Sequence, residues 1–276
     1  MTTNYLYKNV NSNFLEISGE DSADFLQNLI TNDIFKMQNN KILYSCLLTP
    51  QGKFSSDFFI YKNNDSFILE THKKFYKELI NKLNIYKLRS KIKIKDIINK
   101  YSFVIFGNIK INNSYDIFVT DPRNINLGKK LIQTDETITT SSSIEEIDEI
   151  KFHEIHIKNH APYSPLDLIT NKSLLLENNF EKINGISWDK GCYVGQEITA
   201  RMKYRALLKK KIYSLKIISG NINIQDKIVI DNNLIGEVIS KANNYLLCML
   251  NIKLIQNQFE EKNNLKLDNS IILEFL

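Results

Sequence analysis

WDKGCYVGQEITAR, residues 188–201, is the most informative stretch of this 276-residue chain. It contains the only tryptophan, two of the nine glycines and one of the three cysteines. Gly191 and Gly195 permit backbone conformations that other residues avoid. A helix beginning near Gln196 would direct its free N–H groups back toward this glycine-framed loop, and a lysine precedes it, so we expect a thiolate-prone cysteine at Cys192. A structural turn with a passive cysteine is the alternative that these residues leave open.

Length and composition describe an ordinary globular protein. At roughly 100–200 residues per domain, the length suggests two domains, with one large barrel as the alternative. Hydrophobic residues make up 43% and charged residues 24%, which excludes gross disorder, and the net charge of +5 does not by itself indicate nucleic-acid binding. Three widely spaced cysteines form no disulfide framework or CxxC metal site and fit a reducing compartment. No apolar run reaches the length of a membrane span. The N-terminal stretch lacks a charged-then-apolar signal, so we expect an unprocessed, cytoplasmic protein.

The first half of the chain predicts strands around two helices. Asp21 or Ser22 caps a helix after the turn at Gly19, and a second helix at 73–83 places Phe75, Leu79 and Leu83 on one face. Alternating or β-rich runs predict the strands, at 42–48, 54–61, 66–71, 92–94, 101–106 and 115–119. The last of these runs suggest a second, βαβ-like region.

In the second half of the chain, the predicted secondary structure becomes β-rich after residues 203–208. A capping box of Ser143 and Glu146 predicts a helix reaching about residue 158. Short β-rich runs between 211 and 275, with a hairpin turn at 231–233, predict a small barrel. We therefore expect an α+β body over 1–205, with a break near 88–100, and a C-terminal β-barrel domain over 206–276.

The run Lys190–Glu197, KGCYVGQE, resembles the signature of the YgfZ-type folate-binding proteins, which are relatives of the glycine-cleavage T-protein, an aminomethyltransferase. Further segments of residues 14–216 are similar to that family. They are Ile17-Ser18-Gly19, Asp24-Phe25-Leu26-Gln27, Thr31-Asn32-Asp33, Pro50-Gln51-Gly52-Lys53 and Leu88-Arg89-Ser90-Lys91. The eight-residue run is specific, whereas the others are supporting.

This resemblance implies a tetrahydrofolate-binding protein that assists iron–sulfur cluster assembly or repair and thereby affects tRNA modification. It implies a T-protein-like body of mixed sheets with flanking helices, followed by a small barrel. Cys192 would be the reactive group. The other motif-loop positions are Lys190, Gly191, Tyr193, Gly195, Gln196 and Glu197, and the cofactor-binding positions are Phe152, Glu177, Asn32 and Asp57. Phe152 would stack on a pterin and Glu177 would accept its N–H groups, although a core phenylalanine and a solvated loop carboxylate are the alternatives.

The chain departs from the family pattern at several positions. The acidic pair of the T-protein is Ser56-Asp57 here, so one acid is missing, which argues against aminomethyl transfer. His156 and His160 stand where the family often has Arg and Gly, which suggests an altered folate pocket. His153, His156 and His160 share a helical face, but we expect surface or pocket-rim histidines and no metal site.

Residues 198–225 hold seven basic side chains and no acidic ones. Arg201, Lys203 and Arg205 begin this basic patch, which would attract a polyanion such as tRNA or the glutamate tail of a folate. Because only Tyr204 and Tyr213 could interleave with bases, direct RNA contact is not favoured over folate or generic attraction, and a solvated face is the alternative.

Three hypotheses follow. The preferred one is a folate-binding accessory factor, with iron–sulfur proteins as clients and without ordinary enzymatic turnover. The second is a tetrahydrofolate-dependent C1 transferase, and the third is an RNA-binding module. We expect a cytoplasmic monomer that does not associate with a membrane.

Overall fold

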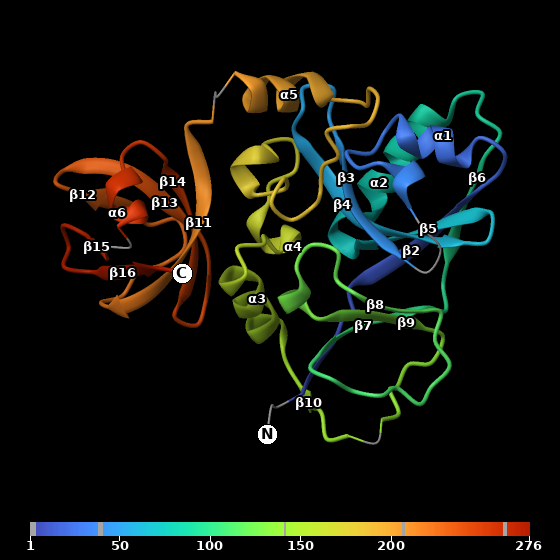
Figure 1. Ribbon diagram of the computed structural model, residues 1–276, viewed down its shortest axis with the longest axis horizontal. Coiled ribbons are helices and arrows are strands. Elements are labelled where there is room, and N and C mark those ends of the chain that lie inside the picture. Colours follow the sequence, from blue (N-terminus) through green and yellow to red (C-terminus); the bar gives the residue numbers. More distant parts are fainter. Residues whose placement is uncertain (1–3, 38–40, 141, 206–207, 262–263) are drawn as a thin grey trace. The chain divides into compact units, whose positions relative to one another are not determined.

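The computed structural model describes residues 4–37, 41–140, 142–205, 208–261 and 264–276 (Figure 1). They form two compact units. Unit 1 comprises residues 1–147, 170–172 and 181–196, and unit 2 comprises residues 148–169, 173–180 and 197–276. The 188–201 stretch is therefore divided between the units after residue 196. The domain boundary near residue 205, which the sequence favours, stays a prediction.

The first sheet of unit 1 is antiparallel and carries the helices that the apolar periodicity predicts. Its strand order is β3-β4-β5-β2-β6. The strands are β2 (Ser12–Ser18), β3 (Ile42–Leu48), β4 (Phe54–Asn63), β5 (Ser66–His72) and β6 (Lys93–Ile97). Helix α1 (Ser22–Gln27) follows β2, and helix α2 (Lys73–Lys87) packs on β4 and β5. Phe75, Leu79 and Leu83 of α2 are buried, as their spacing predicts.

The second sheet of unit 1 has the order β10-β1-β7-β9-β8. The strands are β1 (Tyr5–Lys8), β7 (Tyr101–Phe106), β8 (Ile117–Thr120), β9 (Lys129–Gln133) and β10 (Glu145–Glu146). Only the β1–β10 pair is parallel among these ladders. The βαβ-like expectation is therefore wrong, because β7, β9 and β8 are antiparallel neighbours and no α-helix among the described residues connects them.

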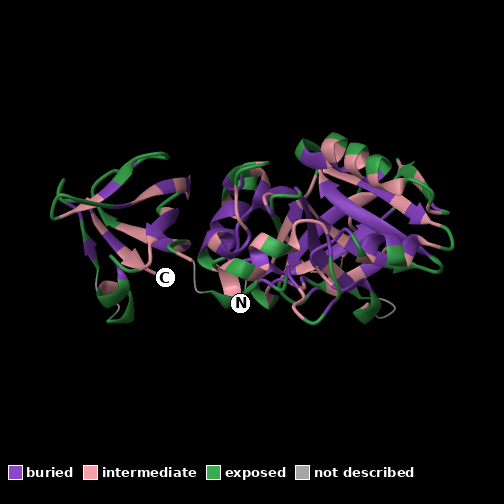
Figure 2. Ribbon diagram, turned by 90° about the horizontal axis from the view of Figure 1, so that it is seen from above, coloured by how far each residue is buried: buried purple, intermediate pink, exposed green. Residues whose placement is uncertain are grey.

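An apolar layer joins the two sheets of unit 1. Phe14, Tyr61 and Ile68 of the first sheet pack with Ile117 and Ile132 of the second. A second core lies between the first sheet and helices α1 and α2. Figure 2 shows buried residues concentrated along the strands of the sheets. The strands that support the candidate site are therefore held from both faces.

Unit 2 contains a six-stranded, barrel-like antiparallel sheet with the order β12-β13-β14-β11-β16-β15. Its strands are β11 (Lys210–Ser219), β12 (Lys227–Ile230), β13 (Asn233–Ala242), β14 (Tyr245–Asn251), β15 (Leu265–Lys266) and β16 (Ile272–Phe275). Asp231 and Asn232 both have positive φ and connect Ile230 to its partner Asn233, which is the geometry of a two-residue hairpin turn. The α+β class with a C-terminal barrel-like sheet is confirmed.

The helices of unit 2 are short. They are α3 (Glu149–Lys158), α4 (Ser164–Asp167), α5 (Gln196–Tyr204, of which Gln196 belongs to unit 1) and α6 (Gln256–Glu260). The predicted capping box is wrong, because Glu146 lies in β10 and the cap of α3 is Asp148, whose carboxylate accepts from Lys151 N at 2.8 Å. No helix in the described part of the chain is both long and apolar enough to cross a lipid bilayer.

Candidate functional site

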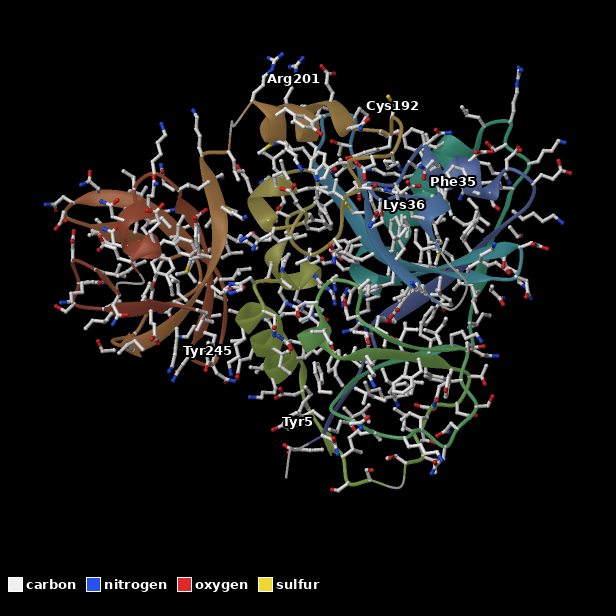
Figure 3. All side chains as sticks on the ribbon, viewed as in Figure 1. Tyr5, Phe35, Lys36, Cys192, Arg201 and Tyr245 are labelled. Carbon is white, nitrogen blue, oxygen red and sulfur yellow. The ribbon has the colours of Figure 1, made fainter. Side chains whose placement is uncertain are left out.

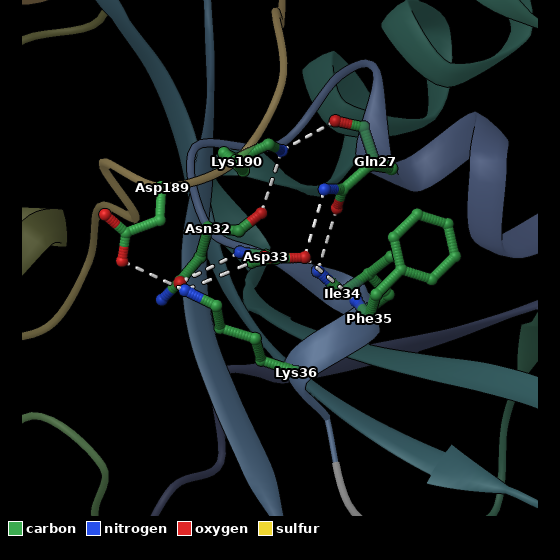
Figure 4. Close-up of polar contacts among 8 residues, drawn as sticks. All are labelled: Gln27, Asn32, Asp33, Ile34, Phe35, Lys36, Asp189 and Lys190. Atoms are coloured by element: carbon green, nitrogen blue, oxygen red, sulfur yellow. Dashed lines mark hydrogen bonds and ion pairs between the residues drawn. The ribbon is translucent and has the colours of Figure 1, made fainter.

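Lys190 attaches the signature loop, residues 188–195, to the turn that follows α1 (Figure 4). Its side chain is buried, and its ammonium donates to the main-chain oxygens of Gln27 at 2.6 Å, Ile30 at 2.6 Å and Asn32 at 2.9 Å. Burial lowers the pKa of Lys190 to about 8, and the charge of Asp33 opposes this shift. All three N–H donors of the ammonium are thus used by carbonyls. The lysine acts as a tether for the loop rather than as a side chain directed at Cys192.

The Thr31-Asn32-Asp33 segment is held by hydrogen bonds at every side chain. Thr31 Oγ1 donates to the main-chain oxygen of Gly185 at 2.7 Å and accepts from Cys46 N at 3.1 Å. The Asn32 amide donates to the main-chain oxygens of Tyr44 at 2.9 Å and Asn184 at 2.7 Å. The side-chain oxygen of Asn32, Oδ1, accepts from Asp33 N at 2.9 Å. Asn32, which the resemblance assigns to the cofactor, therefore orders the turn.

Asp33 continues this network on the far side of the turn. Its carboxylate caps the short 3₁₀ turn Ile34–Lys36 by accepting from Phe35 N at 3.1 Å, and it accepts from Gln27 Nε2 at 3.0 Å. Lys36 reaches Asp189 of the signature loop at 3.2 Å (Figure 4). This last ion pair is exposed and contributes little to stability. The loop is therefore positioned mainly by Lys190.

Gly195 closes the other end of the signature loop. Its φ is +82°, and a Cβ atom added there would lie 2.4 Å from the main-chain oxygen of Thr49 and 3.2 Å from Gly52 Cα. The loop thus lies directly on the turn between β3 and β4, where the Pro50-Gln51-Gly52 signal occurs. At Gly191, by contrast, an added Cβ would meet nothing within 4 Å. Only Gly195 is required by close approach.

Cys192 is exposed, whereas Cys46 and Cys248 are buried. Figure 3 shows Cys192 at the outer end of the signature loop. Burial raises the pKa of Cys46 and of Cys248 well above the range of a free thiol. Because a thiolate is the reactive form, only Cys192 combines access with a rigid backbone on both sides.

Asp57 lies on β4 beside two aromatic rings and a buried arginine. Its Oδ2 accepts from the Tyr44 hydroxyl at 2.7 Å. The guanidinium of Arg123 stacks over the rings of Tyr44 and Phe59, with centroid distances of 5.0 and 4.8 Å. Arg123 also forms two side-chain hydrogen bonds with the carboxylate of Asp121, at 3.0 and 2.8 Å. Burial disfavours the cation, but Asp121, Tyr44 and Asp57 outweigh it and raise the pKa of Arg123.

Sequence reasoning missed this buried cluster. Asp121-Pro122-Arg123 is a local signal, because an Arg two residues after an Asp can form an ion pair with it across a turn. Nothing in these residues indicates that the pair is buried. The second buried ion pair, Lys130 with Glu70 at 2.8 Å, joins β9 to β5 and depends wholly on how the sheets pack. Ser56, the position of the missing acid, is fully buried, and its hydroxyl has no hydrogen-bond partner among the described residues.

The predicted site residues of unit 2 lie in different surroundings. Phe152 is 4% exposed, with its ring edge-on to His156 and to Tyr163 at 4.8 and 5.5 Å between centroids. Glu177 is largely buried and faces Lys210 at 3.7 Å. Arg201 pairs with Glu197 one helical turn earlier, at 2.6 Å.

Lys203 lies on α5 and is partly exposed, and Arg205 follows the helix and is exposed. Arg201, Lys203 and Arg205 therefore lie at the surface of α5 and just beyond its end.

Of these three histidines only His160 is exposed, so the expectation of surface or pocket-rim histidines is wrong for the other two. His153 and His156 are buried, and His153 Nε2 lies 3.0 Å from Asp167 Oδ1 and 3.3 Å from Ser240 Oγ. His160 has φ +54° just after α3. Within the described residues, no three His, Cys, Asp or Glu side chains are arranged to hold a metal ion. His153 and Asp167 thus contribute to the packing of α3 and α4 against β13.

Comparisons with known proteins bear on the fold of this chain. A family model described as the GCVT N-terminal domain matches residues 10–106. The glycine cleavage system aminomethyltransferase T from Bartonella henselae has a similar fold, with a TM-score of 0.72 at 11% identity, over 99% of this chain and 85% of that one. At that identity the likeness shows the fold alone. The protein thus has the fold of the glycine-cleavage T-proteins.

Proteins of similar sequence narrow the class of T-protein-like proteins that this chain resembles. The iron–sulfur cluster assembly factor IBA57 homolog of Mycosarcoma maydis is 28% identical over 73% of this chain and 54% of its own length. IBA57 of Mus musculus is 23% identical over 74% and 63%, and the tRNA-modifying protein YgfZ of Aliivibrio fischeri is 28% identical over 73% and 67%. The alignments thus span about half to two thirds of these relatives. The resemblance to the YgfZ type is confirmed, because the chain is similar both to YgfZ and to the IBA57 proteins.

The same comparison corrects the expected cellular location. The relatives from Mycosarcoma maydis and Mus musculus are mitochondrial proteins by name. The prediction of a cytoplasmic protein is therefore wrong as drawn, because cysteine usage and the N-terminal pattern do not distinguish the cytoplasm from another reducing compartment.

Proposed function

We propose that this protein is an accessory factor for iron–sulfur cluster assembly, in which Cys192 is the reactive thiol. The observation that carries the proposal is the exposed sulfur on a loop attached at one end by Lys190 and at the other by Gly195. Thiolates are the ordinary protein ligands of iron–sulfur clusters. The IBA57 relatives are named as assembly factors and the YgfZ relative as tRNA-modifying, which supports clients that contain such clusters.

Tetrahydrofolate is the cofactor that we propose for this factor. Asp57 provides a carboxylate acceptor, and Tyr193 provides a buried hydroxyl that has no partner among the described residues. Asp57 and Tyr193 both lie within electrostatic range of Cys46. An acceptor and an unused buried donor suit the amine and amide groups of a pterin. Glu177 remains the proposed acceptor in unit 2.

The missing acid favours an accessory role over C1 transfer. Ser56 offers a hydroxyl where the T-protein pattern has a carboxylate, so only Asp57 is available for charge stabilisation at this place. RNA binding is less favoured, because Arg201 is paired with Glu197 and few described side chains would interleave with bases.

The thiol hypothesis is tested in cells that lack the endogenous protein. Cys192→Ala should abolish restoration of iron–sulfur enzyme activity, whereas the purified variant should unfold at the same urea concentration as the wild type. Gly191→Ala, which alters the same loop without a steric conflict, is the matched control. Full restoration by Cys192→Ala would contradict the role of the thiol.

The folate hypothesis is tested by calorimetry with tetrahydrofolate. Asp57→Asn and Glu177→Gln should each weaken binding about tenfold, because each replaces a charged acceptor at constant size. Phe152→Ala is a poor probe, since removing a buried ring costs about 3–5 kcal/mol of stability by itself. Formation of a methylene product from an aminomethyl donor would instead support the transferase alternative.

A further inference from the structure

Unit 2 contains a cavity of about 630 Å³ that shares only Glu177 with the proposed folate site. It lies beside the barrel strands β13 and β14 and helix α5, all of which Figure 1 labels. Its volume falls in the range of small-molecule sites, roughly 300–1,000 Å³. Apart from Glu177, none of its lining residues belongs to the predicted folate set.

The floor of the cavity is apolar. Its apolar side chains come from four separated segments of the chain and are Leu174, Ile198, Met202, Leu234, Ile235 and Met249. Leu234 is 58% exposed, which is unusual for a large aliphatic residue on a barrel strand. Gly236 contributes no side chain, and an added Cβ there would lie 2.2 Å from the main-chain oxygen of Met249. The floor therefore stays open to an apolar group, and two methionines allow it to adjust.

The rim of the cavity is cationic. Lys210 lies 3.7 Å from Glu177, and Lys227 pairs with Glu237. Lys209 lines the cavity as well, and its ammonium has no partner among the described residues. The rim thus carries one positive charge more than negative, and the 3.7 Å separation leaves Lys210 able to donate elsewhere.

We propose that this cavity binds a small carboxylate with an apolar body, of the acyl or aromatic type. The apolar floor takes the body, and Lys209 with Lys210 takes the carboxylate. The size favours a small molecule over a peptide helix, because a helix about 10 Å across fills roughly 400 Å³ per turn and the cavity would hold little more than one turn. The site does not depend on Cys192 or on tetrahydrofolate.

The test uses the full chain and the fluorescent sulfonate 1-anilinonaphthalene-8-sulfonate, with dodecanoate as the competing carboxylate. The probe should bind at one site, and dodecanoate should displace it. Leu234→Glu should weaken the binding of the probe and of dodecanoate about tenfold each, since it places an anion on an exposed part of the floor. Lys209→Met should weaken the binding of each several-fold. The matched controls are Ile224→Glu and Lys266→Met, which alter exposed residues of unit 2 outside the cavity and should change binding less than twofold.

Two results would overturn the proposal. One is a failure of dodecanoate to displace the probe, or an equal response of cavity and control variants. The other is a loss of tetrahydrofolate affinity in Leu234→Glu together with displacement of the probe by tetrahydrofolate, which would make the cavity part of the folate site. Failure of the folate hypothesis alone would leave dodecanoate binding unchanged, so the two proposals can be separated.

Discussion

The ammonium of Lys190 donates a 2.6 Å hydrogen bond to the main-chain oxygen of Ile30, across 160 residues of sequence. The lysine that begins the KGCYVGQE run is therefore a structural tether. Lys190→Met should lower the free energy of unfolding by at least about 2 kcal/mol, because it leaves buried carbonyls without a donor. Urea unfolding measures this, with the exposed Lys182→Met as control. Equal stability of the two variants would contradict the tether.

The lowered pKa of Lys190 also predicts a pH dependence. Between about pH 8, its pKa in the folded protein, and pH 10.5, its ordinary value, the side chain is neutral when folded and protonated when unfolded. Unfolding then takes up a proton, so stability attributable to Lys190 rises with pH across this window, by up to about 1.4 kcal/mol per unit. Urea unfolding of the wild type and Lys190→Met at several pH values should show their difference widening. A constant difference would show that the pKa is not lowered.

Replacing each glycine of the signature loop with alanine should change the free energy of unfolding by different amounts. Gly195→Ala should cost about 1–3 kcal/mol, because it forces a side chain into positive φ and against the Thr49 carbonyl. Gly191→Ala should fall within about 0.5 kcal/mol of the wild type, since space surrounds it. Thermal and urea unfolding of both variants compare them directly. A larger effect at Gly191 than at Gly195 would refute the proposed packing of the loop.

Substitution of Arg123 should destabilise the protein more than substitution of most other charged residues. Arg123→Met leaves the carboxylate of Asp121 buried without its partner, so we expect a loss of about 3–5 kcal/mol. Adding Asp121→Asn should recover much of that loss, because the uncompensated charge disappears. The exposed Arg89→Met controls for loss of an arginine as such. If the double variant were no more stable than the single one, the buried pair would not explain the effect.

Cys192 should be the only fast thiol in the folded protein. Reaction with a chromogenic disulfide at pH 8 should label one cysteine quickly, and all three should react in urea. Cys192→Ser should abolish the fast phase, since burial keeps Cys46 and Cys248 protonated and inaccessible. A fast phase that survives in Cys192→Ser would assign it to another sulfur.

Local patterns predicted much of the secondary structure because periodicity and turn chemistry act over a few residues. Phe75, Leu79 and Leu83, spaced four residues apart, form the buried face of α2. The 231–233 turn connects the expected hairpin. The start of α5 at Gln196 also follows from its preceding glycine. These features are complete within one segment of chain, so the sequence contains all that decides them.

Long-range partners could not be predicted in the same way. Glu146 fits a capping box locally, yet pairing with Leu6 of β1 places it in a strand. Asp21 precedes α1 as predicted, but its carboxylate accepts from Lys91 N at 2.6 Å rather than capping the helix. In both cases a partner from far along the chain competes with the local one.

The sequence by itself therefore determined the α+β class, most strands, the glycine-framed cysteine and the resemblance that followed from it. The tertiary structure alone decided that Lys190 binds carbonyls, that Gly195 packs on the β3–β4 turn and that Arg123 stacks on Tyr44. The physical reason is that burial and hydrogen-bond partners depend on which segments the chain topology brings together, and no pattern within a few residues encodes that.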